Sequence, residues 1–138
     1  MYPFLRDRDH LKIVHVSEYK LGEIVAYECN GEIVVHRIID IMNGKYIIIG
    51  DNIPLYDDII GREKIWGSVA CLKRNFKEIN VKGFCCYTIV IMKFSYITLK
   101  IREFLGKKNM FGIMICKLLH FIINPILKVI YYVEKIEN

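Results

Sequence analysis

The sequence predicts a mainly β protein with a small bent sheet or barrel over residues 1–82 and an apolar, amphipathic helical tail over 83–138. Short runs rich in β-branched residues, separated by turn residues, recur through the first part. Asn43-Gly44, the strongest short hairpin signal, lies between two of these runs. After Lys82 the composition changes to long apolar stretches that are typical of helices.

The tail is predicted to be helical where its periodicity is clear. Residues 84–101 are apolar and interrupted only by Lys93, and their length and β-branched content permit either a helix or a strand. Residues 110–135 are predicted to form one or two amphipathic helices, because Pro125 interrupts the run and Asn124 is a suitable cap for a second helix. We expect this segment to lie on a membrane interface or to cover the β domain rather than to span a bilayer.

The polar residues of the tail follow a helical spacing. They are Lys117, His120, Asn124 and Lys128, which fall three or four residues apart and predict one polar stripe on an otherwise apolar helix.

The expected strands of the first part share short length and a high content of Val, Ile and aromatic residues. They are residues 11–16, 23–28, 32–42, 45–50 and 65–73. Glycine or proline lies between successive runs, which favours tight connections and antiparallel pairing over β-α-β units.

The Asn43-Gly44 hairpin predicts which residues face each other. If the loop is these two residues, paired residue numbers sum to 87, and His36 faces Asp51. Directly opposed side chains have Cβ atoms roughly 4.5–5.5 Å apart, so an imidazole would lie beside a carboxylate. A bulge in the ladder would instead put the two on opposite faces of the sheet.

A histidine beside an aspartate supplies two members of a nucleophilic triad. The imidazole accepts the proton of a hydroxyl, and the carboxylate fixes its tautomer and stabilises the imidazolium. The alternative is a structural pair at a sheet edge, which the pattern by itself favours.

Composition restricts the partners. The net charge of +5 is modest and scattered, so we expect no nucleic-acid partner. Five cysteines show neither metal-ligand spacing nor a disulfide framework, so no metal and no cofactor is expected. Residues 1–15 carry several charges and do not resemble a signal peptide. The hydrophobic content of 54% makes association with a membrane a reasonable expectation, on a side that the sequence does not determine.

Three blocks, in order, resemble the signal-peptidase type of serine endopeptidase, which shares its fold with the self-cleaving LexA-like repressors. MYPFLRDRDHLKI (1–13) resembles the Ser-Met-x-Pro segment and the turn and strand that follow it. LGEIVAYECNGEIVVHRIIDI (21–41) resembles the strands that lead to the general base. YIIIGDNIPLYDDIIGREKIWGSV (46–69) resembles the Gly-Asp-Asn block and the closing strand. The resemblance therefore covers the β part, for which it implies a signal-peptidase-like core, and leaves 84–138 unexplained.

The resemblance implies roles for individual residues. His36, followed by arginine, matches the branch of the family whose base is histidine, and Asp51 would orient it. Asp57 or Asp58 would be a second acid, or an ordinary loop carboxylate. A further set would line the groove for an extended peptide substrate: Met1, Tyr2 and Pro3.

The family nucleophile is the serine before the methionine of Met-x-Pro, and that position precedes Met1. The resemblance thus implies a membrane-associated endopeptidase that cleaves leader or signal peptides, with its nucleophile just upstream of Met1. The chain as printed would then be inactive. The alternative is a catalytically inactive peptide-binding module of the same fold.

Overall fold

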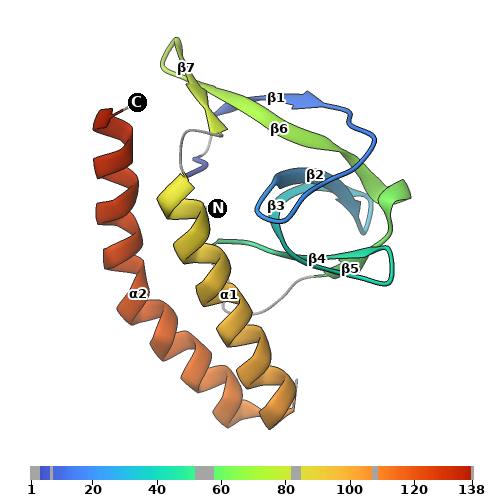
Figure 1. The fold of residues 1–138 in the computed structure, drawn as a ribbon, viewed down its shortest axis with the longest axis vertical. Coiled ribbons are helices and arrows are strands. Elements are labelled where there is room, and N and C mark those ends of the chain that lie inside the picture. The colour runs from blue at the N-terminus through green and yellow to red at the C-terminus, as the bar shows by residue number, and fades with distance from the viewer. Residues whose placement is uncertain (1–3, 7, 52–57, 82–84, 107–108, 138) are drawn as a thin grey trace.

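The computed structural model describes residues 4–6, 8–51, 58–81, 85–106 and 109–137. In this part of the chain, seven strands form one antiparallel sheet that does not close, and two helices follow it (Figure 1). The predicted architecture, a bent sheet with a C-terminal helical part, is confirmed.

The strands pair in the order β1-β6-β2-β3-β4-β5, and β7 also pairs with β6. Their bounds are β1 His10–Val14, β2 Ile24–Cys29, β3 Glu32–Met42, β4 Lys45–Ile49, β5 Asp58–Ile60, β6 Ile65–Arg74 and β7 Lys77–Asn80. Five of them match the predicted strands to within a few residues. The sequence did not indicate β5 and β7, because segments of three and four residues are too short to show an alternating pattern.

The β3–β4 hairpin confirms the predicted turn and corrects the predicted register. Asn43 and Gly44 have φ values of 52° and 72°, as a type I′ turn requires, and Met42 pairs with Lys45. The register then shifts between Ile38 and Asp40, so that Ile38 pairs with Ile48. This bulge adds one residue to β3, and every residue before it faces the side opposite to the one counted from the turn.

The two faces of the sheet bury different clusters. One face holds Tyr19, Val25, Tyr27, Ile38, Tyr46, Ile48, Ile60 and Ile65 inside the bend of the sheet. The other face packs against the helices and holds Ile24, Val69 and Leu72 together with residues of both helices, and a smaller group of Ile39, Ile47, Ile49 and Leu99. Ile38 belongs to the first cluster and Ile39 to the smaller group on the other face, and Ile39 is the extra residue of the bulge.

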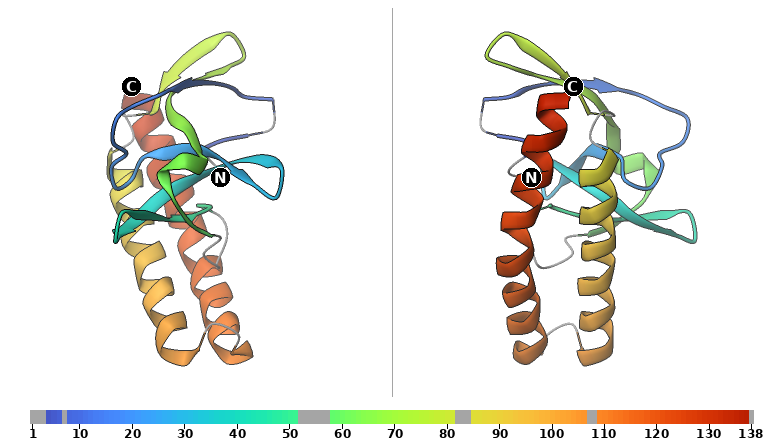
Figure 2. Two further views of the ribbon diagram at one scale, coloured as in Figure 1. Left: turned by 90° about the vertical axis from the view of Figure 1, so that its right-hand side faces the viewer. Right: turned by 60° about the vertical axis from the view of Figure 1, so that its left-hand side comes forward.

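The helices form a hairpin. They are α1, Cys85–Leu105, and α2, Met110–Glu137. Residues 84–101, which the sequence left open, are therefore helical from Cys85. Figure 1 shows α1 nearer to β3 and β4 than α2 is, and Figures 1 and 2 show the turn between the helices projecting beyond the sheet. The C-terminal half of α2 also reaches the sheet, where Tyr131 accepts a hydrogen bond from Arg74. Tyr87, Ile91 and Phe94 of α1 share a core with Leu127 and Tyr131 of α2, so the helices and the sheet have a common interior.

The structure decides between one and two helices in α2 and corrects one expectation for it. Of the one or two helices predicted for 110–135, the structure has one, which continues through Pro125. Burial of Cys116 and His120 before the proline, and of Leu127 after it, holds both halves in place, and this packing outweighs the backbone hydrogen bond that proline cannot donate. His120 is not part of an exposed polar stripe: it is 6% exposed, and its ring lies 4.7 Å from that of Phe94.

One helix in the described part of the chain, Met110–Lys135, is long and apolar enough to cross a membrane, as judged by length and composition.

The end of α2 caps the beginning of α1. The two carboxylate oxygens of Glu134 accept hydrogen bonds from the backbone N–H groups of Cys86 (2.7 Å) and Tyr87 (2.9 Å). The first N–H groups of a helix have no partner within the helix, and the helix dipole favours a negative charge there. Glu134 therefore couples the formation of α1 to the docking of α2.

Replacing Glu134 with alanine removes this cap. We expect the free energy of unfolding to fall by about 1–2 kcal/mol, because two N–H groups at the start of α1, that of Tyr87 buried and that of Cys86 partly buried, lose their acceptor. Urea denaturation followed by far-UV circular dichroism measures the loss. Lys135→Ala, which changes the exposed neighbour, is the matched control. An equal effect of both substitutions would show that the cap contributes nothing.

Candidate active site

A buried ion pair lies at the centre of the region where the sequence predicts a site. Arg37 on β3 donates two parallel hydrogen bonds to Asp51, from Nε to Oδ1 and from Nη2 to Oδ2, each 2.8 Å long. The two side chains are 2% and 1% exposed. A planar guanidinium matches a carboxylate in this two-bond geometry, which is the strongest form of the pairing.

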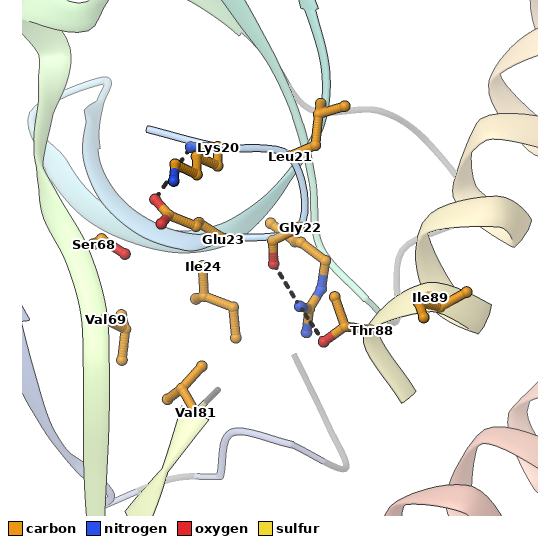
Figure 3. A pocket seen from close by; sticks show the side chains of 11 residues that line it. Lys20, Leu21, Gly22, Glu23, Ile24, Ser68, Val69, Val81, Thr88 and Ile89 are labelled. Atoms are coloured by element: carbon orange, nitrogen blue, oxygen red, sulfur yellow. Dashed lines mark hydrogen bonds between the residues drawn. The ribbon is translucent and has the colours of Figure 1, made fainter. Parts of the chain in front are cut away.

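The remaining contacts of Arg37 join three other segments. Its Nη1 donates to the carbonyl oxygen of Gly22 (2.8 Å) and to Oγ1 of Thr88 on α1 (3.2 Å). Figure 3 draws both hydrogen bonds as dashed lines that end on Gly22 and Thr88. Its guanidinium lies 5.9 Å from the ring centroid of Phe4 and 5.8 Å from that of Tyr87. The arginine thus connects the N-terminal segment, the turn before β2, the chain after β4 and the start of α1.

Tyr87 completes the surroundings of the pair. Its hydroxyl donates to Oδ2 of Asp51 at 3.4 Å. Burial, together with the negative charge of Asp51, raises the pKa of Tyr87 well above its usual range, so the phenol is a hydrogen-bond donor at every physiological pH. The Asp51 carboxylate therefore accepts hydrogen bonds from both Arg37 and Tyr87.

His36 lies on the other face of β3. It pairs with Val25 of β2, and its ring centroid is 6.1 Å from that of Tyr27, a member of the cluster inside the bend. The imidazole is half-buried, and its Nδ1 is 2.5 Å from the carbonyl oxygen of Val35. A carbonyl oxygen can only accept, so Nδ1 carries the hydrogen and Nε2 is the basic nitrogen of the neutral ring.

The prediction that His36 and Asp51 are direct cross-strand neighbours is wrong. After the bulge Arg37 pairs with Ile49, and the ladder continued by one pair brings His36 opposite Gly50. Asp51, two residues beyond Ile49, shares the face of Arg37. No hydrogen bond or ion pair joins His36 to Asp51 among the residues that the structure describes. One extra residue in β3 accounts for the difference, because side chains alternate strictly along a strand.

The other predicted site residues are only partly described. Met1, Tyr2, Pro3 and Asp57 lie outside the described residues. Asp58 begins β5, where its backbone pairs with that of Ile48.

The serines within the described ranges lie away from His36. Ser68 on β6 and His36 on β3 both pair with Val25 of β2, which lies between them. The backbones of Ser68 and His36 are therefore two strand spacings apart, roughly 10 Å, which is too far for a hydrogen bond between side chains that point the same way. Ser17 is exposed in a bend, and Ser95 is buried in α1. None of these hydroxyls is a nucleophile for His36 in this arrangement.

A second arginine, which the sequence did not single out, holds the N-terminal segment. Arg74 at the end of β6 forms a two-bond ion pair with Asp9, and it donates to the carbonyl oxygen of Phe4 (2.8 Å) and to the hydroxyl of Tyr131 (2.9 Å). The ring of Phe4 packs against Tyr87 and Tyr131. Phe4 therefore contacts both arginines, Arg37 through its ring and Arg74 through its carbonyl oxygen. These contacts fix the position of the residue that follows the Met-x-Pro motif. Asp9 and Arg74 are 65 positions apart, and no local pattern in the sequence indicates that two such distant residues pair.

Arg37 also lines a cavity on the helix-facing side of the sheet. The cavity, of about 380 Å³, lies between the turn before β2, β6 and the start of α1 (Figure 3). Gly22, Ser68, Val81 and Thr88 are among its lining residues, and His36 is not. The cavity is thus separate from the imidazole. Within the described ranges, no group of three or more His, Cys, Asp or Glu side chains could hold a metal ion.

Comparison with known proteins gives no family assignment: no family model, curated protein or solved structure matches the chain significantly.

The geometry of the ion pair predicts a large structural effect of Asp51→Asn. The substitution leaves a buried guanidinium without its counter-charge, so we expect the free energy of unfolding to fall by about 3–5 kcal/mol. Chemical denaturation measures this. Glu103→Gln, in the exposed Lys100–Glu103 pair, is the control and should cost no more than about 1 kcal/mol. Unchanged stability of Asp51→Asn would contradict the structural role.

The Arg74–Asp9 pair predicts a dependence of stability on acid. Burial opposes ionisation of Asp9, but hydrogen bonds and charge from Arg74 and Arg6 outweigh it, and the pKa of Asp9 is lowered. A lowered pKa in the folded state stabilises the fold above the unfolded pKa of about 3.9, and this stabilisation disappears as the pH falls through the folded value. Thermal unfolding between neutral pH and pH values well below 4 should therefore show a smaller acid loss for Asp9→Asn than for the unaltered protein. Glu18→Gln, at an exposed position, should follow the unaltered protein.

Proposed function

We propose that this chain forms the core of a serine endopeptidase of the signal-peptidase type, with His36 as its general base. The observation that supports this best is the orientation of the imidazole. Its Nδ1 hydrogen is directed to the Val35 carbonyl, which leaves Nε2 as the basic nitrogen. A half-buried histidine of this tautomer, on the strand where the resemblance puts the base, suits proton transfer from a hydroxyl.

In the proposed reaction the nucleophile is a serine directly before Met1. Its hydroxyl attacks the carbonyl carbon of the scissile peptide bond, and Nε2 of His36 accepts the hydroxyl proton. The same proton then goes to the leaving amine as the peptide C–N bond breaks and an acyl-enzyme forms. Water, deprotonated in turn by His36, hydrolyses the acyl-enzyme.

The carboxylates have separate parts in this proposal. Asp57 or Asp58 stabilises the imidazolium, because Asp51 is engaged by Arg37 and Tyr87. Asp51 is a positioning residue: it holds Arg37, the neighbour of His36 in β3, and so fixes the strand on which the base lies. The substrate class is an extended leader or signal peptide, and the apolar helix α2 supports work at a membrane.

A comparison of two proteins tests the proposal. One is the chain as printed, and the other carries a serine directly before Met1. Both are incubated in detergent with leader-type peptides that have small residues at the cut, and products are identified by mass spectrometry. We expect turnover only from the extended protein, with the printed chain slower by about 10³-fold or more, because it forms no covalent intermediate.

His36→Ala in the extended protein should abolish cleavage and leave the circular dichroism spectrum unchanged. His15→Ala is the matched control, since Nδ1 of His15 also lies near a backbone carbonyl, that of Trp66, at 3.3 Å. Binding of peptide without cleavage by the extended protein would favour the peptide-binding module instead. Cleavage by the printed chain that is lost on replacing Ser17 or Ser68 would show that the nucleophile has been misassigned.

A further inference from the structure

The outward face of α2 is apolar along its whole length. Nine large apolar residues on this face are between 45% and 78% exposed. They are Phe111, Met114, Leu118, Phe121, Ile122, Ile126, Val129, Tyr132 and Val133, and together they are called the outward face. At a rise of 1.5 Å per residue the row is roughly 33 Å long. These exposures show that α1 and the sheet leave most of this face uncovered, although the hydroxyl of Tyr132 accepts a hydrogen bond from Arg6 (3.4 Å).

The inward face of α2 is mixed: Leu127 and Tyr131 belong to the shared core, and the other buried residues are small or polar. Cys116 is buried and donates to the carbonyl oxygen of Thr98 on α1 (3.7 Å). His120 is buried against Phe94, and Glu134 caps α1. Water-soluble helices bury their apolar side and expose their polar side. The reverse arrangement, with small and polar groups between helices and apolar groups outside, is typical of helices in contact with lipid.

The exposed charges of α2 form one positive edge. Lys117, Lys128 and Lys135 are separated by 11 and 7 residues, so at 100° per residue they lie within roughly 20° of one another. This edge is about a quarter turn from the middle of the outward face. Glu134, the acidic residue with a described side chain in α2, is buried. A helix pair between two copies would need charges of both signs along its edges, whereas a single positive edge complements anionic headgroups.

The contacts of α2 favour an orientation parallel to the bilayer. A spanning helix would carry Lys117 and Lys128 into the hydrocarbon, which is strongly unfavourable. It would also carry α1, whose Lys93 and Lys100 are exposed. Hydrogen bonds from Arg74 to Tyr131 and from Arg6 to Tyr132 hold the C-terminal half of α2 beside the sheet. An in-plane helix keeps these contacts, and its lysines reach the headgroups while their alkyl chains stay on apolar surface.

We propose that the outward face of α2 is a docking surface for an anionic lipid bilayer. The helix lies in the plane of the interface, its apolar row in the acyl boundary and its lysine edge at the lipid phosphates. This inference rests on the proposed membrane association and names its surface, orientation and lipid class. It does not depend on the peptidase chemistry.

Flotation of the full chain with vesicles of phosphatidylcholine, with and without phosphatidylglycerol, tests the docking surface. Leu118→Asp combined with Phe121→Asp should abolish binding to both kinds of vesicle. Ile89→Asp combined with Ile97→Asp, at apolar positions of α1 that are each 53% exposed, should bind like the unaltered chain. Equal loss in both pairs would overturn the assignment to α2.

The lysine edge has its own comparison. Replacing Lys117, Lys128 and Lys135 with glutamine should weaken binding to phosphatidylglycerol vesicles by about 5-fold per lysine. The same change at the exposed residues Lys12, Lys45 and Lys73 of the sheet is the matched control and should have little effect. An equal loss in both sets would show a general charge effect and contradict the proposed edge.

Depth measurements distinguish the in-plane helix from a spanning one. In a Trp66→Phe background, tryptophan is introduced as Phe111→Trp, Phe121→Trp or Tyr132→Trp and quenched by lipids brominated at different depths. Equal, shallow depths are expected for all three. A much greater depth at residue 121 would show a spanning helix and overturn the orientation.

Sedimentation without lipid tests for a second copy on the same face. The unaltered chain should remain monomeric in mild detergent. A dimer that the Leu118→Asp and Phe121→Asp pair converts to a monomer, together with no vesicle binding, would assign the face to a second copy. One further variant combines Leu118→Asp and Phe121→Asp with the serine before Met1 and is assayed on a soluble leader peptide. If it loses vesicle binding but still cleaves the peptide, docking and catalysis are separate properties, and each proposal can fail without the other.

Discussion

The ion pair between Arg37 and Asp51 is the interaction on which the arrangement of this chain depends. A guanidinium and a carboxylate that are both buried are costly to remove from water, and good geometry and further hydrogen bonds must offset that cost. Here the offset comes from Gly22, Thr88 and Tyr87, which belong to different segments. Folding of the sheet, docking of α1 and placement of the chain after β4 are therefore required together.

The bulge in β3 makes this ion pair possible. In the register counted from the hairpin turn, Arg37 would lie on the same face as Tyr46 and Ile48 of β4, inside the bend of the sheet. The extra residue turns Arg37 toward the helices, where its partners are, and leaves His36 beside Tyr27. A single inserted residue thus separates the carboxylate of Asp51 from the imidazole of His36 and places the two side chains on opposite faces of the sheet.

The helical hairpin combines two kinds of surface. Its inner side shares a core with the sheet through Tyr87, Ile91 and Tyr131, and Glu134 ties its two helices together. Its outer side is apolar along α2 and has a positive edge. If the sheet works on extended peptides near a bilayer, α2 would hold it at a constant distance from the lipid, because the same contacts that dock α2 also position Phe4 and the N-terminal segment.

Local chemistry in the sequence was enough to determine five of the strands, a bent sheet or small barrel as the architecture and the Asn43-Gly44 turn, because β-branched runs and a dipeptide that tolerates positive φ act over a few residues. The helix over 110–135 could also be predicted from the sequence, because its polar residues recur every three or four positions. The bulge at Ile39, the partner of Asp51 and the burial of His120 were decided by tertiary structure. Each depends on groups that are distant in the sequence. The bulge lies where β3 contributes to two apolar clusters, Asp51 accepts from a buried guanidinium, and α1 covers the side of α2 that carries His120. Pro125 shows the same principle, since packing along α2 keeps continuous a helix that local propensity would have ended.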